Sequence, residues 1–358
     1  MTTSVSNNTL PAGLGENPKV AVVILCWNGK KYLEEFLPQV LQNTHYPNTE
    51  IVVADNCSTD GTREFVQEKF PEVGYVFNAE NNGFAQGYND ALKQVEADIY
   101  VLLNQDATVA ENWVAPVVDM MKQDPWLAAA QPKVIAERER ERFEHAGASG
   151  GFLDKWGYPF CRGRLFFLTE EDQGQYDDPV EIFWATGACM FVRADLYWKA
   201  GGLDNDFFAH MEEIDLCWRI KNMGYSIKCI PSSVAYHVGG GSLSYDNPKK
   251  AYLNFRNSLI MLIKNLPPYE ALYIIPIRFA LDFLALVRMG TEGNVRAMFA
   301  VSKAHRQFLY YFPKWYKKRR EAKKLWDQPN LSGTYPKSLV WEFFGKGKKK
   351  FSDLNWKP

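Results

Sequence analysis

The sequence predicts an α/β fold built around a doubly wound, mostly parallel sheet. Two observations lead to this prediction. In roughly the first hundred residues, short apolar runs alternate with segments whose apolar residues recur at helical spacing, and repeats of this kind form parallel sheets with right-handed crossovers. The apolar runs also stop at polar residues, which should lie at the sheet edge where open α/β sheets bind ligands.

Composition places the chain among ordinary globular proteins. Its 358 residues are 46% hydrophobic and 23% charged, which suits one large domain or two smaller ones. The six cysteines include no CxxC pair, and several lie within apolar segments, which indicates buried thiols in a reducing compartment and argues against a zinc site. Residues 1–18 are expected to be a disordered leader without a secretory signal, so we expect a cytoplasmic protein.

The first predicted strand spans residues 19–27 and is broken at Asn28. A helix follows over residues 30–43, and a second strand over residues 50–54 ends at Asp55. A carboxylate at the tip of the second strand is well placed to accept a hydrogen bond from the ring or ribose of a nucleotide. The polar residues just before the next helix can serve as its cap, but capping does not account for Asp55.

A third strand is predicted over residues 74–78, followed by a loop that leads into a helix. Gly83 and Gly87, before this helix, let its backbone amides approach an anion. A plain helix start explains the two glycines as well. No GxGxxG motif follows the first strand, so a dinucleotide cofactor is not indicated.

The fourth predicted strand is an apolar run from Tyr100 that stops abruptly at Asn104, Gln105 and Asp106. At the carboxyl end of a buried strand, Asp106 has an oxygen free to hold a divalent cation, which in turn can hold a diphosphate. The alternative is a carboxylate that only begins the next turn.

Beyond Asp106 the alternation is less regular. We expect a helix over residues 111–121 and a strand over residues 128–135. The dense run of acids and bases over residues 137–144 is interpreted as a solvated segment. A loop rich in glycine and aromatic residues, 147–163, is expected to border a site or simply to pack its aromatics.

Strand character resumes over residues 183–192, where Gly187 allows a ligand or another backbone to approach closely. An amphipathic helix then opens with four ionisable residues within eight positions, Glu212, Glu213, Asp215 and Arg219. The helix dipole favours an acid at such a position and accounts for one of them. Three acids together favour a site.

A late strand is predicted over residues 224–230. In residues 234–242 another strand ends at His237, from which the chain runs into three glycines. A lone histidine is usually a packing residue. Because the backbone around His237 is open, we also consider it a candidate metal ligand.

From about Lys19 to His237, and more weakly over residues 252–257, the chain resembles the family 2 inverting glycosyltransferases with the GT-A fold, in the rhamnosyltransferase-like branch. The resemblance implies a GT-A domain over residues 19–240, with a nucleotide-binding half up to Asp106 and an acceptor-side half after it. Residues 241–358 would form a helical, basic extension. It also implies a dTDP- or UDP-linked sugar donor and Mg²⁺ or Mn²⁺ as cofactor.

The resemblance also implies roles for individual residues. The family's Asp-X-Asp-type metal motif falls on Asn104-Gln105-Asp106, where only the last position is acidic, and His237 matches a histidine that completes the metal shell in some relatives. The catalytic base falls on Glu213, where aspartate is commoner. Donor contacts are implied for Trp27, Asn28, Asp55, Asn82, Gly83, Gly87, Asn89, Asn104 and Gln105. Acceptor-side or supporting roles are implied for Trp184, Gly187, Glu212, Asp215, Arg219 and Arg256.

These residue types suit a single displacement at a sugar carbon. A carboxylate takes the proton of the acceptor hydroxyl while a cation neutralises the departing diphosphate, which inverts the anomeric configuration. We therefore expect transfer of a sugar, with rhamnose favoured by the resemblance, to a glycan or lipid-linked acceptor in cell-surface polysaccharide synthesis. The alternatives are a non-catalytic nucleotide-sugar or carbohydrate-binding protein and a sugar-nucleotide pyrophosphorylase, although residues 27–31 are a poor match to the phosphate loop of the latter.

The C-terminal region is basic, with thirteen Lys and Arg against four Asp and Glu from Lys314 onward. Such a tail favours an anionic partner such as a phospholipid surface, or is merely solvated, and no nucleic acid partner is expected. Residues 271–287 are apolar enough to suggest a membrane span, but Arg278 and Asp282 argue against one. Residues 266–320 are expected to lie on the inner membrane face, or to form a helical cap or a dimer surface.

Overall fold

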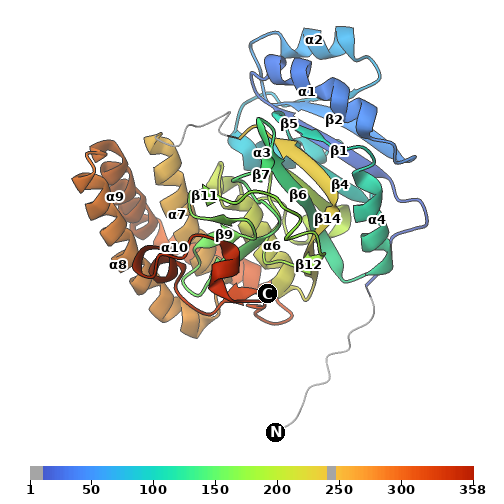
Figure 1. Cartoon of the computed structure of the whole chain (residues 1–358). Helices are drawn as coiled ribbons and strands as arrows, with labels where there is room; N and C mark the ends of the chain where they lie inside the picture. The colour runs from blue at the N-terminus through green and yellow to red at the C-terminus, as the bar shows by residue number, and fades with distance from the viewer. Residues whose placement is uncertain (1–10, 240–246) are drawn as a thin grey trace.

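The computed structural model describes residues 11–239 and 247–358. Its centre is a ten-stranded sheet. Eight of these strands lie in the order β12-β14-β6-β13-β4-β1-β2-β3, and the other two, β5 and β7, pair with β14 and β6. Helices cover both faces of this sheet, and a group of C-terminal helices lies at one side of the molecule (Figure 1). Residues 1–10 of the expected leader and the end of the glycine run after His237 lie outside the described residues.

The first four strands are parallel, as the sequence predicts. They are β1 (Val20–Cys26), β2 (Thr49–Asp55), β3 (Gly74–Phe77) and β4 (Ile99–Asn104), connected by α1 (Lys30–Asn43), α2 (Thr62–Lys69) and α3 (Gly83–Leu92). The register pairs Cys26 with Asp55 and Leu25 with Asn104. The polar residues that follow these strands therefore lie at one edge of the sheet.

Alternate residues of β1 face two separate apolar cores. Val20, Val22 and Ile24 belong to a core shared with α1 and with α4 (Val114–Gln123). Ala21 and Val23 belong to a core shared with α3 and with α6 (Glu212–Asn222). A strand buried on both faces is typical of a sheet covered by helices on both sides. The expected doubly wound arrangement is confirmed.

The second half of the chain completes the sheet. Its elements are β5 (Ala107–Val109), α4 (Val114–Gln123), β6 (Leu127–Ala136), β7 (Glu139–Phe143), β12 (Val180–Glu181), β13 (Cys189–Arg193), α5 (Ala194–Lys199), η1 (Asn205–Phe207), α6 (Glu212–Asn222) and β14 (Ser226–His237). Because β13 is antiparallel to both β4 and β6, β6 runs parallel to the first four strands.

Two predicted strands differ from the structure. The strand expected over residues 183–192 begins only at Cys189, because Gly187 and Ala188 form a turn. The two late strands are a single strand, β14, with a register shift between Ile230 and Val234. Pro231 lies in this shift, and proline cannot donate a ladder hydrogen bond.

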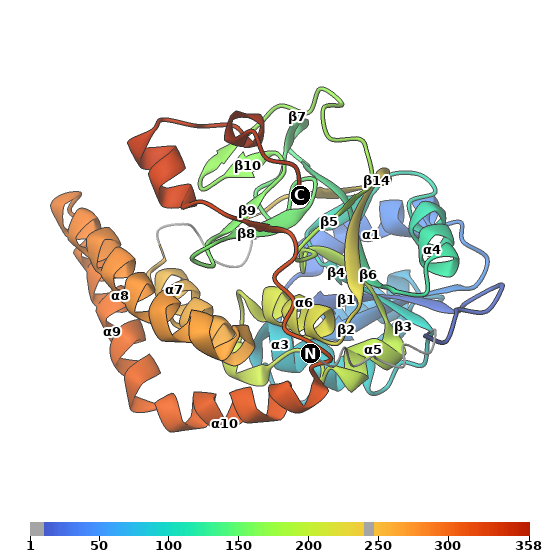
Figure 2. The same ribbon diagram turned by 90° about the horizontal axis from the view of Figure 1, so that it is seen from below.

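The glycine-rich segment expected as a loop forms part of a second sheet. This five-stranded sheet has the order β11-β10-β9-β8-β15, with β8 (Gly151–Asp154), β9 (Pro159–Cys161), β10 (Arg164–Leu165), β11 (Leu168–Thr169) and β15 (Thr334–Tyr335). The C-terminal strand β15 pairs in parallel with β8. Figure 2 shows the last part of the chain running beside β8, β9 and β10.

The C-terminal region is mainly helical, as expected. It contains α7 (Pro248–Asn265), α8 (Pro268–Thr291), α9 (Val295–Tyr310), α10 (Phe312–Ala322), η2 (Lys323–Leu325), η3 (Trp341–Gly345) and η4 (Phe351–Leu354). Helix α7 packs on α6, whereas α8 and α9 lie side by side at the far side of the molecule from α1 and α2 (Figures 1 and 2). Within the described residues, none of the helices combines the length and apolarity of a membrane span.

Candidate active site

The loop after β1 interlocks with the end of β4. The backbone N–H of Trp27 donates to Oε1 of Gln105 at 2.9 Å, and a Cβ added to Gly29 would lie 2.2 Å from the same oxygen. Asn28 has a φ of 47°, and its side-chain oxygen accepts from the N–H of Thr59 at 2.8 Å. The indole of Trp27 remains 50% exposed at the carboxyl end of the sheet, where a flat ring of a ligand can stack on it.

Asp55 is buried and held by two donors. One oxygen accepts from the N–H of Ser58 at 2.9 Å, and the other accepts from the hydroxyl of Tyr75 at 2.5 Å. A carboxylate has further lone pairs, so these bonds fix its orientation without exhausting its capacity. Tyr75 is a supporting residue that the sequence analysis did not identify.

The start of α3 is packed too closely for side chains at its glycines. Gly83 has a φ of 86°, and a Cβ there would lie 2.6 Å from the ring of Phe208. A Cβ at Gly87 would lie 2.9 Å from the amide of Asn56, which donates to Asn81 at 2.9 Å. The two glycines therefore allow close packing of α3 against its neighbours. Among the predicted donor contacts in this stretch, the side chain of Asn82 is exposed.

Asn89 is committed to protein contacts. Its side-chain N–H groups donate to the carbonyl of Leu203 and the side chain of Asn205, both at 2.7 Å, and its oxygen accepts from the hydroxyl of Tyr197 at 2.7 Å. The amide therefore ties α3 to the segment that leads into α6. Asn89 therefore helps to position that segment relative to α3.

His237 connects the end of β4 to a second carboxylate. Its Nε2 lies 3.2 Å from Oδ1 of Asp106 and 3.1 Å from the side-chain amide of Asn104, and its Nδ1 lies 3.3 Å from Oε2 of Glu144. Burial disfavours the charged form of each group, but these contacts raise the pKa of His237 to about 10 and hold the pKa values of Asp106 and Glu144 below their ordinary range.

Glu144 corrects one prediction from the sequence. The charge pattern of residues 137–144 predicts a solvated run, and Glu139 and Glu141 are indeed exposed. Glu144 instead is only 5% exposed, because it follows Phe143, which pairs with Ile135 of β6 and turns the chain inward. Its carboxylate faces His237.

The donor set of Asp106 and His237 suits a cation that is completed by its substrate. A carboxylate oxygen and an imidazole nitrogen are ligands for Mn²⁺, and Mg²⁺ is often bound by one or two carboxylates together with substrate phosphates. The described residues contain no preformed cluster of three His, Cys, Asp or Glu groups suited to a metal ion. With a cation on Nε2, the remaining ring N–H of His237 would donate to Glu144, the usual way in which a ligating imidazole is oriented.

The loop before α6 is strained and is held by α7. Phe208, His210 and Met211 have φ values of 65°, 70° and 74°, which non-glycine residues rarely adopt. The side-chain N–H groups of Asn257 donate to the carbonyls of Phe207 and Ala209 at 2.9 Å and of His210 at 2.8 Å. Strain of this kind persists only where surrounding bonds enforce it, and it is common at active sites.

Arg256 also supports this loop. Its guanidinium donates to the carbonyl of Asp206 at 2.6 Å and to the hydroxyl of Tyr252 at 3.1 Å. The structure therefore places Arg256 among the residues that shape the entry into α6.

Glu212 and Glu213 open α6 directly after the strained loop. Glu212 is buried and Glu213 is partly buried, and within the described residues the Oε2 atom of each has no hydrogen-bond partner. Burial raises the pKa of Glu213 to about 7, and burial together with the neighbouring Glu213 raises the pKa of Glu212 well above its ordinary value. A carboxyl group with a pKa near neutrality is well suited to general base catalysis.

Asp215 and Arg219 anchor α6 instead of facing a ligand. Asp215 is fully buried and accepts from Arg219 at 2.9 Å, from Lys264 at 2.8 Å and from the side chain of Asn265 at 2.8 Å. Arg219 also donates to the carbonyl of Gly202 at 2.8 Å. The network fixes the helix that carries Glu213.

Trp184 is likewise a packing residue. Its indole N–H donates to the carbonyl of Phe152 at 3.0 Å, and a Cβ at Gly151 would lie 2.2 Å from its ring. With its ring covered by β8, Trp184 supports the second sheet beside the site.

The turn at Gly187 links the two halves of the candidate site. A Cβ at Gly187 would lie 3.8 Å from Cβ of Glu213 and 3.3 Å from the ring of Phe84. The next residue, Ala188, accepts a hydrogen bond from the backbone N–H of Asn104 at 3.0 Å. Glu213 and the segment from Asn104 to Asp106 therefore lie at the same edge of the sheet.

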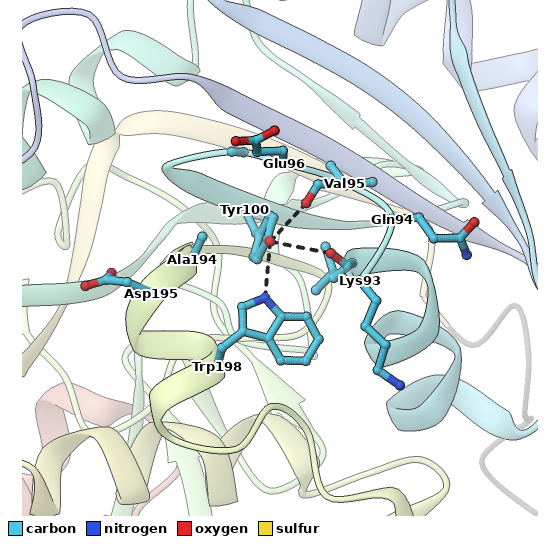
Figure 3. Close-up of a pocket in the computed structure, with 10 residues that line it drawn as sticks. Lys93, Gln94, Val95, Glu96, Tyr100, Ala194, Asp195 and Trp198 are labelled. Carbon is cyan, nitrogen blue, oxygen red and sulfur yellow. Dashed lines mark hydrogen bonds between the residues drawn. The ribbon is translucent and has the colours of Figure 1, made fainter.

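A separate cavity of about 820 Å³ lies at the opposite edge. It is lined by residues from the end of α3 and the start of α5, and the Tyr100 hydroxyl in it donates to the carbonyl of Val95 at 3.0 Å and accepts from Trp198 at 3.2 Å (Figure 3). Because Tyr100 is near the amino end of β4, this cavity is not the site formed by Asp106 and Glu213.

The sequence matches the model of the family described as Glycosyl transferase family 2 over residues 21–201, about half of the chain. The chain belongs to glycosyl transferase family 2. The enzyme class expected from the sequence, a glycosyltransferase, is thereby confirmed.

Curated and solved relatives agree with this family 2 assignment. The chain is 24% identical over 271 residues to an N-acetylglucosaminyl-diphospho-decaprenol L-rhamnosyltransferase of Mycobacterium tuberculosis, which covers 67% of this chain and 83% of the relative. The structure of GalNAc-T7 with UDP, GalNAc and Mn²⁺ aligns with a TM-score of 0.60 at 15% identity and covers 92% of this chain and 56% of that one. The structure of residues 1–349 of S. aureus TarS with UDP-GlcNAc aligns with a TM-score of 0.52 at 15% identity. This alignment covers 89% of this chain and 99% of the TarS chain. The GT-A fold is confirmed.

Proposed function

We propose that this family 2 glycosyltransferase moves a sugar from a nucleoside diphosphate donor to a hydroxyl group with inversion at the anomeric carbon. One observation carries the proposal. A carboxyl group with a pKa near 7, Glu213, lies at the same sheet edge as the Asp106 and His237 pair, with the Gly187 turn between them. A base, and at the same edge a pair of residues that can hold a cation for the diphosphate, are what the displacement of a diphosphate requires.

The donor would lie along the carboxyl ends of β1, β2 and β4. The exposed Trp27 ring and the oriented carboxylate of Asp55 flank this edge, and Gln105 holds the loop between them. A base or ribose between Trp27 and Asp55 would place the diphosphate near Asn104 and Asp106. We propose a dTDP- or UDP-linked sugar, and the rhamnosyltransferase relative favours rhamnose.

Asp106 and His237 would hold Mg²⁺ or Mn²⁺, with Glu144 orienting the imidazole. The cation, when bound, supplies positive charge that neutralises the departing diphosphate. Asn104, which contacts His237 through its side-chain amide, offers a neutral polar group at the position where the family motif carries an acid.

Glu213 would take the proton from the acceptor hydroxyl as the new bond forms. A single carboxylate suffices for an inverting displacement, because no covalent sugar intermediate has to be formed. The neighbouring Glu212, whose pKa burial and Glu213 raise, would remain protonated and would not repel the charge on Glu213. The carboxylate is positioned by α6, whose buried Asp215 and Arg219 pair resists movement.

The acceptor we propose is a glycan or a lipid-linked glycan in cell-surface polysaccharide synthesis. The name of the mycobacterial relative, which acts on a decaprenol-linked diphosphate sugar, supports a lipid-linked acceptor. Six unpaired cysteines, five of them buried, support a reducing compartment and therefore a cytoplasmic location. The family assignment weighs against the pyrophosphorylase and non-catalytic alternatives.

A donor panel tests the proposal. The purified protein would be incubated with dTDP-rhamnose and UDP-sugars in the presence of Mn²⁺ and a polyprenyl-diphosphate-linked acceptor, and released nucleoside diphosphate would be measured. We expect one donor to be consumed by the wild type and to be spared by Glu213→Gln. Consumption of that donor at the same rate by both proteins would overturn the role of Glu213. In a separate incubation with a nucleoside triphosphate and a sugar 1-phosphate, release of pyrophosphate would indicate the pyrophosphorylase reaction instead.

A further inference from the structure

The outer face of α8 is largely apolar, and the two charged residues in the middle of the helix are buried. Arg278 and Asp282, the residues that argued against a membrane span, are buried, with Nε of Arg278 3.6 Å from Oδ1 of Asp282. Arg278 also donates to Ser258 at 2.9 Å, and Asp282 accepts from Tyr158 at 3.0 Å. These charges are satisfied by the protein itself.

The exposed residues of α8 form a continuous stripe. Its large apolar residues are each 45–84% exposed: Tyr269, Leu272, Tyr273, Phe283, Leu284 and Val287. The exposed Pro276 and Ala280 lie between Tyr273 and Phe283, so the spacing of three and four residues that places side chains on one helix face is kept along the helix. A helix of this length, Pro268–Thr291, spans about 36 Å. A surface helix of a globular protein normally shows the opposite pattern, with its apolar face inward. A patch of this kind marks an interaction surface.

The elements beside α8 carry exposed basic and aromatic residues. Helix α9 packs beside α8 and contains no acidic residue, and its exposed positions include Arg296, Phe299, Lys303 and Arg306. At the end of α8, the Arg288 guanidinium lies 5.0 Å from the ring centroid of Phe344 in η3, where Trp341 is also exposed. Figures 1 and 2 both show α8 and α9 together at the side of the molecule away from α1 and α2.

The sequence alone pointed to the basic residues from Lys314 onward, but several of these are engaged within the protein, among them two of α10. Lys314 and Lys318 of α10 each lie 2.5 Å from an oxygen of Asp206. They hold α10 to the segment before the strained loop. The basic residues of α9 are therefore better placed for an external partner.

We propose that the outer face of α8, with the exposed basic and aromatic residues of α9 and η3, binds the surface of a bilayer that contains anionic phospholipids. An apolar stripe bordered by Lys and Arg and carrying Tyr and Trp is the pattern of a helix that lies in the membrane interface. Each basic residue near an anionic surface adds attraction. A second copy of the chain is a poorer occupant, because its α9 cations would face those of the first.

Vesicle flotation of the full chain tests this surface without any sugar donor, so its outcome is separate from that of the transfer reaction. The probes are vesicles of phosphatidylcholine alone and vesicles with added phosphatidylglycerol. We expect the wild type to float with the anionic vesicles, less at high salt, and weakly with phosphatidylcholine. Leu284→Glu should bind at least about tenfold more weakly, because it places a charge where the wild-type leucine would enter the apolar part of the bilayer.

A matched control is Gln67→Glu, which adds the same charge at an exposed position of α2 on the other side of the molecule. It should float like the wild type, and both variants should keep the wild-type melting temperature because both positions are exposed. Absence of wild-type flotation with anionic vesicles would overturn the proposal, as would equal flotation of Leu284→Glu. A wild-type dimer that Leu284→Glu converts to a monomer without loss of flotation would assign the face to a second copy instead.

Discussion

Nδ1 of His237 lies 3.3 Å from Oε2 of Glu144, and both side chains are buried. This contact leaves Nε2 of the imidazole facing Asp106 at the carboxyl end of β4. A histidine whose second nitrogen is held by a carboxylate has a fixed ring orientation and a more basic free nitrogen. We therefore expect Glu144 to orient the imidazole in the proposed cation site.

Replacing Glu144 should weaken the cation site without removing a proposed ligand. For Glu144→Gln we expect Mn²⁺ affinity in the presence of a nucleoside diphosphate to fall by about 10- to 100-fold, since the imidazole loses the carboxylate that orients it. Electron paramagnetic resonance of free Mn²⁺ measures this directly. Glu139→Gln, at an exposed position of β7, is the control and should bind like the wild type. Equal affinity of all three proteins would contradict the positioning role.

Asp106→Ala should uncouple donor binding from the metal. In the wild type we expect Mn²⁺ to increase donor affinity, and in the variant this increase of about tenfold or more should disappear, because the carboxylate that would share the cation with the diphosphate is gone. Titration calorimetry with and without Mn²⁺ measures the difference. A variant that keeps the full Mn²⁺ effect would exclude Asp106 as a ligand.

Glu213→Gln should lose turnover and keep donor binding. Removal of a general base costs about a hundred- to ten-thousand-fold in kcat, and the amide preserves the shape of the side chain. Single-turnover transfer assays and donor calorimetry on the same preparation separate the two effects. Glu213→Asp should recover part of the rate, because it restores the carboxylate at a shorter reach. An unimpaired kcat in Glu213→Gln would assign the base elsewhere.

The rate of transfer should depend on pH through Glu213. Because burial raises the pKa of this carboxyl to about 7, the base is largely protonated below neutrality. We expect kcat/KM to rise roughly tenfold per pH unit up to about pH 7 and then to level off. A flat profile between pH 5 and 8 would be inconsistent with Glu213 as the base.

The pH dependence of folding stability gives an independent check on the raised pKa of Glu213. A carboxyl whose pKa rises from 4.5 to about 7 on folding binds its proton more tightly in the folded state, so its contribution to stability is lost as the pH rises from about 4.5 to 7. Glu213→Gln does not titrate. Denaturant melts should therefore show the variant gaining stability relative to the wild type over this range.

Asn257→Ala should loosen the segment that leads into α6. The side chain of Asn257 donates to three carbonyls of that segment, and leaving buried carbonyls unpaired costs about 1–3 kcal/mol. We expect a matching loss in the free energy of unfolding together with a lower kcat, measured by denaturant unfolding and transfer assays. Asn254→Ala on the same helix, where the side chain is only partly buried, is the control. A kcat that is unchanged in Asn257→Ala would mean that the strained conformation is not needed for transfer.

The parts of the fold that the sequence predicts correctly are those specified by local pattern. Strands β1, β2 and β4 are long apolar runs, and the polar residues at their ends are enough to predict that Asp55 and Asp106 share one edge of the sheet. The start of α6 is visible because three acids open an amphipathic helix. In each case the signal lies within a few consecutive residues.

The parts that the sequence does not predict depend on partners distant in the chain. Glu144 ends a run of alternating charges, and only the pairing of Phe143 with Ile135 turns it inward. The amide of Asn89, expected to contact the donor, is used by residues that follow more than a hundred positions later. Strand β15 consists of two residues and is defined only by its pairing with β8. Such contacts leave no periodicity in the sequence.

The return of the last residues to β8 ties the C-terminus to the catalytic half. Phe351 and Trp356 pack on Phe152 with ring centroids 5.8 and 5.2 Å away, and the backbone N–H of Leu339 donates to Asp154 at 2.7 Å. A chain shortened to the family-matched residues would leave these aromatic rings uncovered and the small sheet open at its β8 edge. We therefore expect the transferase domain and its C-terminal extension to unfold together, and engineering work should keep both.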